Sequence, residues 1–105
     1  ENLILPYTSL SNRCYANMFY NCSLLTKSPV LPAKTLYTNC YMAMFRNCSS
    51  LEEIKCLATG VSGSNCTSNW VYGVAPTGTF IKNPSMNNWT TGANGIPSGW
   101  TVEDA

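Results

Sequence analysis

Apolar residues recur at an interval of 26 positions along this chain. Residues 14–25 are CYANMFYNCSLL, and residues 40–51 are CYMAMFRNCSSL. Shifting the chain on itself by 26 residues gives 11 identities in the 21 positions from Leu5 to Leu25. A period of roughly 20–50 residues is typical of solenoids, because one unit cannot bury its apolar face alone and stacks on the next. The sequence therefore predicts a repeat protein.

The spacing within each unit predicts a helix. Cys14, Met18 and Cys22 lie at i, i+4 and i+8, beside the pair Tyr15 and Phe19. Positions three or four residues apart share one face of an α-helix. We expect a helix over residues 12–20 and an equal one 26 residues later, stacked in parallel and ending at the Asn-Cys-Ser turns of residues 21–23 and 47–49.

A strand is expected after each helix, over Leu25–Leu31 and Leu51–Leu57. The inward residues should be Leu25, Ser28 and Val30 in the first strand and Leu51, Ile54 and Cys56 in the second. The outward pairs should be Thr26 with Glu52, Lys27 with Glu53, and Pro29 with Lys55. An ion pair between Lys27 and Glu53 would fix the register more than it stabilises the fold. Pro29 cannot donate to a ladder, so the first strand should be short or broken.

The repeat decays after Leu57. Asn65 and Cys66 stay in phase, Trp70 and Val71 take the places of Met44 and Phe45, and Thr79–Lys82 should form the next strand, with Phe80 at the Ile54 position. Residues 73–105 combine turn signals with Trp89 and Trp100. Terminal repeats differ from internal ones because no neighbour covers them. We therefore expect one domain over residues 1–105, with about two and a half repeats in 1–72 and a C-terminal cap in 73–105.

The low charge of the chain excludes several partners. Charged residues make up 10% of the sequence, and the net charge is +1. These values do not support electrostatic binding of nucleic acid or of an anionic membrane surface. No apolar run reaches the roughly 20 residues that span a bilayer, so membrane insertion is not expected. The start at Glu1, without Met, indicates either a cleaved signal or a trimmed chain.

The six cysteines are expected to be packing residues. Cys14, Cys40 and Cys66 are spaced by 26 residues, as are Cys22 and Cys48, so each recurs at one place in the repeat. Helices of adjacent units lie about 8–10 Å apart. Disulfides need Cα atoms within about 7 Å. Most thiols should therefore be free and buried. Cys56 belongs to neither series, and a disulfide framework remains the alternative.

The residue inventory argues against an enzyme. The sequence has no histidine, which excludes His-based catalysis and His metal sites. Glu52 and Glu53 are neighbours on a strand and should point to opposite sides. The cysteines do not form the close pairs of a zinc site. We expect no catalytic residues, no metal and no cofactor.

Two other groups of residues have a structural and a functional interpretation. The Asn-x-Ser/Thr triplets at Asn21, Asn47, Asn65 and Asn88 could accept glycans, but the first three coincide with the predicted turns, so a structural role is favoured. Trp89, Trp100 and Tyr72 could form an aromatic platform for a sugar ring. We favour the alternative that they close the open end of the core.

Three motifs carry a resemblance to a known family: MF-x-N-C-S-x-L after the predicted helix, Leu-Pro before the next turn, and the tail from Cys66 to Trp100. Together they resemble the BspA-type leucine-rich repeat proteins, common among exported proteins of gut Bacteroides. The resemblance implies that Cys22 and Cys48 occupy the ladder position of a leucine-rich repeat. The first unit departs from the pattern, because Leu25, Ser28 and Val30 make a weak strand motif. The family implies surface display and binding without chemistry.

The expected fold is an α/β solenoid, leucine-rich-repeat-like, with short parallel strands on one face, helices on the other and an irregular C-terminal cap. The expected function is a non-enzymatic module, extracellular or at a bacterial cell surface, that binds a protein or glycan. The alternative is a structural terminal unit of a longer array. The candidate binding residues are Thr26, Lys27, Glu52, Glu53, Lys55 and Ile81. Since no N-terminal cap is recognisable, the first predicted strand should have an unpaired edge, which predicts self-association.

Overall fold

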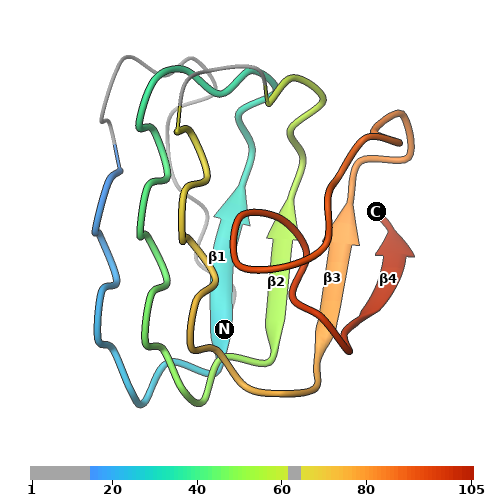
Figure 1. Cartoon of the computed structure of the whole chain (residues 1–105). Coiled ribbons are helices and arrows are strands. Elements are labelled where there is room, and N and C mark those ends of the chain that lie inside the picture. Colours follow the sequence, from blue (N-terminus) through green and yellow to red (C-terminus); the bar gives the residue numbers. More distant parts are fainter. Residues whose placement is uncertain (1–14, 62–64) are drawn as a thin grey trace.

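The structure is a computed structural model that describes residues 15–61 and 65–105. Four strands form one parallel sheet in chain order: β1 (Lys27–Leu31), β2 (Glu53–Cys56), β3 (Thr79–Lys82) and β4 (Thr101–Asp104). Opposite the sheet, the connecting segments of successive units run beside one another in a second layer (Figure 1). Glu53 of β2 pairs with Thr79 of β3, so the 26-residue repeat sets the register of the sheet.

The predicted helices are absent from the described residues, so the expected α/β solenoid with helices opposite the strands is wrong. Residues 15–21, 38–47 and 65–73 run instead as consecutive turns, here called the turn layer. At nearly every fourth position of this layer φ is positive, at Asn17, Asn21, Asn39, Ala43, Asn47, Asn65, Asn69 and Gly73. Asn and Gly enter the left-handed region more readily than other residues. A residue in that region ends an α-helix, so none can propagate here.

The backbone of the turn layer makes hydrogen bonds in two directions. The N–H groups of Phe19 and Phe45 each donate to the next unit, at Met44 O and Trp70 O, over 2.9 Å in both cases. The intervening residues donate within their own turn, as Met44 N–H does to Tyr41 O over 3.0 Å. Because this alternation continues along the layer, it links neighbouring units on this side as the sheet does on the other.

The core lies between the two layers. The sheet contributes Ile54 and Phe80, which pair as the repeat phase predicts. The turn layer contributes Tyr41, Phe45 and Trp70, all fully buried. The ring of Trp70 stacks on Tyr41, with centroids 5.9 Å apart, and on Trp89, with centroids 5.6 Å apart. The aromatic side chains of successive units therefore form a continuous stack across the repeats.

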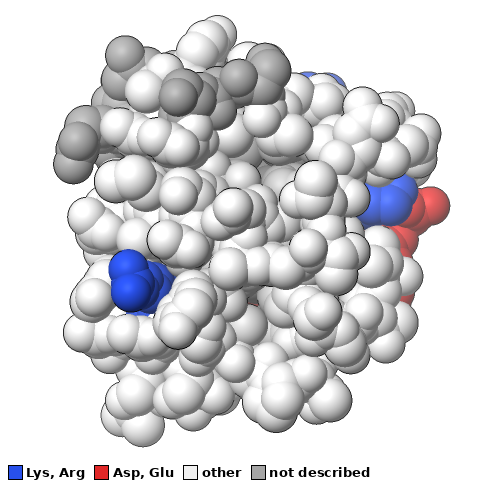
Figure 2. Space-filling model, in the orientation of Figure 1, with Lys and Arg blue, Asp and Glu red and all other residues white. Residues whose placement is uncertain are grey.

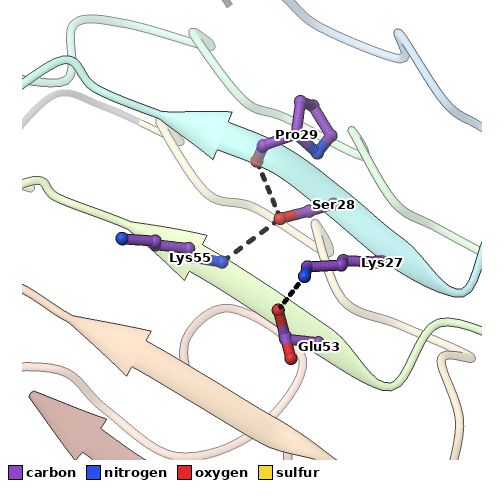
Figure 3. A network of polar contacts seen from close by, with 5 residues as sticks. All are labelled: Lys27, Ser28, Pro29, Glu53 and Lys55. Carbon is purple, nitrogen blue, oxygen red and sulfur yellow. Dashed lines mark hydrogen bonds and ion pairs between the residues drawn. The ribbon is translucent and has the colours of Figure 1, made fainter. Parts of the chain in front are cut away.

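Strand β1 contains the one register irregularity of the sheet as described. Lys27 lies opposite Glu53 as predicted, and their side chains form an ion pair of 3.2 Å. Pro29 does not lie opposite Lys55, because the register shifts and Val30 takes that position. The hydroxyl of Ser28 accepts the N–H of Lys55 and donates to Pro29 O (Figure 3). Val30 is consequently half-buried rather than one of the inward residues.

The segment expected to be an irregular cap continues the sheet. Strand β3 has the predicted bounds, and β4, which was not predicted, pairs with it through Ile81 and Glu103. Trp100 is 7% exposed, and its Nε1 donates to Ala75 O over 2.8 Å. The two tryptophans of this segment therefore cover the core, as the favoured interpretation has it. The repeat identities at positions 5–14, Cys14 included, lie outside the described residues.

The cysteines divide into buried and exposed positions. Cys40, Cys48, Cys56 and Cys66 are buried as expected, whereas Cys22 is exposed, so the prediction is wrong there. Cys22, Cys48 and Cys56 are free thiols. Burial raises the pKa of Cys56 to about 12 and also raises the pKa of Cys48. The Cys48 thiol donates to Phe19 O over 2.9 Å, which links two units.

Substitution of Ala43 by glycine should cost less stability than the same substitution at Ala33. Ala43 has a φ of 53°, in the region where an L-residue other than Asn or Gly costs about 1–2 kcal/mol. Removing its Cβ relieves that strain, but it also increases the entropy of the unfolded chain and removes a buried methyl group, since Ala43 is 7% exposed. We expect Ala43→Gly to leave the free energy of unfolding, measured in urea, within about 1 kcal/mol of wild type. Ala33→Gly is the control, because Ala33 is buried without a positive φ and should lose at least about 1 kcal/mol more than Ala43→Gly does. Equal losses in both variants would contradict the role of backbone strain.

The free thiols should differ in reactivity in the folded state. The thiolate is the reactive species, and a thiol of pKa about 12 is ionised to about one part in 10⁴ at pH 8. We expect iodoacetamide at pH 8 to modify Cys22 readily and Cys56 only after urea unfolding, as read by peptide mass spectrometry. Modification of Cys56 in native protein as fast as Cys22 would contradict its burial.

Candidate functional site

The outer face of the sheet carries the candidate binding residues. Ile54 and Phe80 point into the core, so their neighbours along β2 and β3 point outward. The outward residues of β2 and β3 are held on both sides by the backbone ladder, since each of these two strands is paired with two neighbours. This face is therefore a fixed array of side chains rather than a flexible loop.

A polar groove crosses this face at the start of the strands. It has a volume of about 420 Å³, and its walls are Thr26, Lys27, Glu52, Glu53, Thr77, Gly78 and Thr79. Gly78 is required by the packing beneath it, because a Cβ there would lie 2.5 Å from Glu52 O. The backbone of Glu52 is fixed on both sides, as its N–H donates to Thr26 O and its carbonyl accepts the N–H of Thr79. The groove thus presents hydroxyl, ammonium and carboxylate groups on a rigid floor.

A second pocket continues the groove along the strands. It has a volume of about 180 Å³ and is lined by Lys27, Ser28, Val30, Glu53, Lys55 and Ile81. The structure therefore places all six predicted residues around two pockets that share Lys27 and Glu53. Thr77, Gly78 and Thr79 also line the groove but were not predicted as binding residues, although Thr79 belongs to the predicted strand and takes the place of Glu53 in the repeat.

The charges on this face are partly compensated. The ion pair between Lys27 and Glu53 is solvent-exposed, with the Lys27 side chain 52% and the Glu53 side chain 34% accessible. Such a pair contributes roughly 0–1 kcal/mol, so a ligand could replace either partner at small cost. Glu52 is exposed, and within the described residues neither Glu52 nor Lys55 forms an ion pair. One acid and one base therefore remain available beside the shared ion pair.

The aromatic platform, which was the less favoured interpretation of Trp89, Trp100 and Tyr72, does not form. Trp89 stacks on Trp70 and Trp100 is buried, whereas Tyr72 is exposed and belongs to the turn layer. The ring of Tyr72 lies against Arg46, whose Cζ is 5.2 Å from the ring centroid. Tyr20 contacts the same guanidinium from the preceding unit, at 6.0 Å. Sequence reasoning missed this group, although the three residues are spaced by the repeat length of 26.

The asparagines of the turn layer have structural roles. Asn21, Asn47 and Asn65, the first three of the candidate glycan acceptors, all have positive φ. The side-chain amide of Asn47 donates to the Asn21 side chain over 3.0 Å, which adds a contact between units. A Cβ on Gly73, at the next equivalent position, would lie 2.7 Å from Asn47 Oδ1. These residues fit the backbone geometry whether or not they carry glycans.

Neither a metal centre nor a membrane span is found in the described part of the chain. No group of three or more His, Cys, Asp or Glu side chains there is placed to hold a metal ion. No helix among those residues has the length and apolar character needed to cross a bilayer. Comparison of the chain with protein-family models, with curated proteins and with solved structures finds no match.

Proposed function

We propose that the protein is a non-enzymatic module that binds a protein or glycan partner through the outer face of its sheet, outside the cell or at a bacterial cell surface. The observation that carries the proposal is the polar groove of about 420 Å³ across β1, β2 and β3. Its walls come from three consecutive repeat units, and stacked repeats commonly bind through such an extended surface. The resemblance to BspA-type proteins is the basis for the proposed location.

The chemistry of the groove suits hydrogen bonding to a polar ligand. Threonine hydroxyls at Thr26, Thr77 and Thr79 both donate and accept, Lys27 donates, and the carboxylates accept. Lys27, Glu53 and Thr79 lie on paired strands, so binding would cost little ordering entropy at these positions. Ile81 and Val30, in the adjoining pocket, add apolar contact area.

A structural role as the terminal unit of a longer array is the alternative. Trp89 and Trp100 favour it, because Trp89 stacks on Trp70 and Trp100 is 7% exposed, so both close the core after the repeats. The two functions differ in what happens when the sheet face is changed. Only the binding function depends on Glu53 and Lys55.

The double variant Glu53→Gln, Lys55→Gln tests the proposal. It removes one charge of each sign and therefore keeps the net charge of +1. Wild type and variant would be applied to arrays of extracellular-matrix proteins and glycans, and any ligand found would be titrated by calorimetry. We expect at least about a tenfold loss of affinity in the variant, because both side chains line the site.

Lys34→Gln is the control for this experiment, since Lys34 is exposed and lines neither pocket of the sheet face. Thermal unfolding of each variant would show that the fold is retained. Equal affinity of the double variant and wild type for a ligand would place binding elsewhere. No ligand on either array would favour the terminal structural role.

We also propose that the protein associates with itself through the N-terminal edge of the sheet. Within residues 15–61 and 65–105, β1 pairs with β2 alone. A strand edge with unpaired backbone groups pairs readily with another chain, and a lysine on the edge suppresses this. We expect the sedimentation coefficient to rise between about 10 µM and 1 mM, and Val30→Lys to reduce the rise. A wild-type protein that stays monomeric at about 1 mM would contradict the proposal.

A further inference from the structure

A second candidate site lies on the turn layer, away from the sheet. Tyr20, Arg46 and Tyr72 occupy equivalent positions in successive units. The guanidinium carbon of Arg46 is 6.0 Å from the ring centroid of Tyr20 and 5.2 Å from that of Tyr72. Both tyrosines remain accessible, with 41% of the surface of Tyr20 and 52% of that of Tyr72 exposed. We call this group the Tyr–Arg–Tyr site.

Arg46 has no compensating anion in the part of the chain that is described. It is the only charged residue in the segments 15–21, 38–47 and 65–73, and neither ion pair found there involves it. Figure 2 shows the same situation on the face that it displays, where one isolated blue patch lies over the turn layer in an otherwise uncharged region. A cation without a counter-ion attracts an external anion, and the aromatic neighbours partly shield it from water, which strengthens that attraction.

The geometry of the guanidinium restricts how an anion can bind. Arg46 Nε is buried and makes no hydrogen bond, whereas the residue as a whole is only half-buried. The donors left for a ligand are therefore the two terminal amino groups. These point the same way from one planar group and match the two oxygens of a carboxylate. The contacts with both tyrosine rings limit rotation of the plane, so the pair of donors is oriented in advance.

We propose that the Tyr–Arg–Tyr site binds the carboxylate of an acidic sugar. The two terminal amino groups of Arg46 would donate to the carboxylate oxygens, and the exposed part of the Tyr72 ring would pack against the apolar face of the sugar ring. A single cation suits a ligand with one negative charge, whereas nucleic acids and polyanions require several. The site is separate from the sheet-face groove and does not depend on the function proposed for it.

An adjoining pocket gives the ligand room for an apolar substituent. Tyr72 also lines a cavity of about 210 Å³, together with Val71, Val74, Pro76 and Pro97 among others. Apolar side chains dominate these walls, which suits a methyl group such as that of an N-acetyl substituent. N-acetylneuraminic acid carries both a carboxylate and an N-acetyl group, and it is therefore the probe of choice.

The test is a titration followed by two-dimensional NMR of isotope-labelled protein. N-acetylneuraminic acid should shift the Arg46 Nε–Hε signal and the amide signals around Tyr72, saturating at millimolar concentration. Arg46→Lys keeps the charge but loses the planar pair of donors, so we expect affinity to fall at least about fivefold. Arg46→Gln and Tyr72→Leu should each abolish saturation. Lys34→Gln removes one positive charge from an exposed position outside the site and should bind as wild type does.

Two further ligands distinguish recognition of an acidic sugar from binding of neutral sugars or of acidic peptides. N-acetylglucosamine, which has no carboxylate, should produce no saturating shift, and an equal response to it would overturn carboxylate recognition. Blocked glutamate, acetylated and amidated, should bind at least about tenfold more weakly, since it has no ring for the tyrosines. Equal affinity for blocked glutamate would reassign the site to acidic peptides. Absence of saturation with every probe, with the backbone spectrum unchanged, would show that the stack is purely structural.

Discussion

The left-handed residue at nearly every fourth position of the turn layer is the constraint on which the remaining structure depends. It folds the chain into successive four-residue turns, in which one peptide N–H bonds within the turn and the next bonds to the adjacent unit, as Phe19 does to Met44. In a helix the backbone N–H groups would donate within their own segment, so neighbouring units would contact each other through side chains alone. Here the backbone itself holds the units together on both sides of the core.

Close stacking of units also determines where side chains meet. Residues separated by 26 positions lie directly beside one another, so the repeat generates columns of equivalent residues. At the core this gives the stacked rings of Phe19 and Phe45, and on the outside it gives the ion pair of Lys27 with Glu53. The contact of Arg46 with Tyr72 has the same origin. A substitution in one unit therefore acts on its neighbours in the adjacent units more than on its neighbours in sequence.

The pairing of the strands could be predicted from the sequence, whereas the conformation of the segments between them could not. The 26-residue period is sufficient to pair Ile54 with Phe80 and to locate β3, because these depend only on equivalence between units. The prediction of helices was wrong because a spacing of four residues fits a four-residue turn as well as a helical turn of 3.6 residues. The distinguishing signal was the asparagine at the same spacing, as at Asn17 and Asn21, which favours positive φ and disfavours a helix. Pro29 indicated an irregular first strand, and the register does shift between Lys27 and Val30, but the acceptance of the Lys55 N–H by the Ser28 hydroxyl could not be predicted.

Of the two candidate sites, the sheet face could be predicted from the sequence and the Tyr–Arg–Tyr site could not. Alternation along a strand is enough to place Glu53, Lys55 and Ile81 on one face, so the composition of that face can be predicted from the sequence. The contacts of Arg46 with the two tyrosines were not predicted, because Arg46 lies in a segment expected to be a helix. In a helix its neighbours would be residues three and four positions away rather than residues 26 positions away. In a chain with 10% charged residues, the position of each uncompensated charge carries information. On the sheet face the charges are partly paired with each other, whereas Arg46 faces only aromatic rings, so the turn layer has the clearer requirement for an external anion.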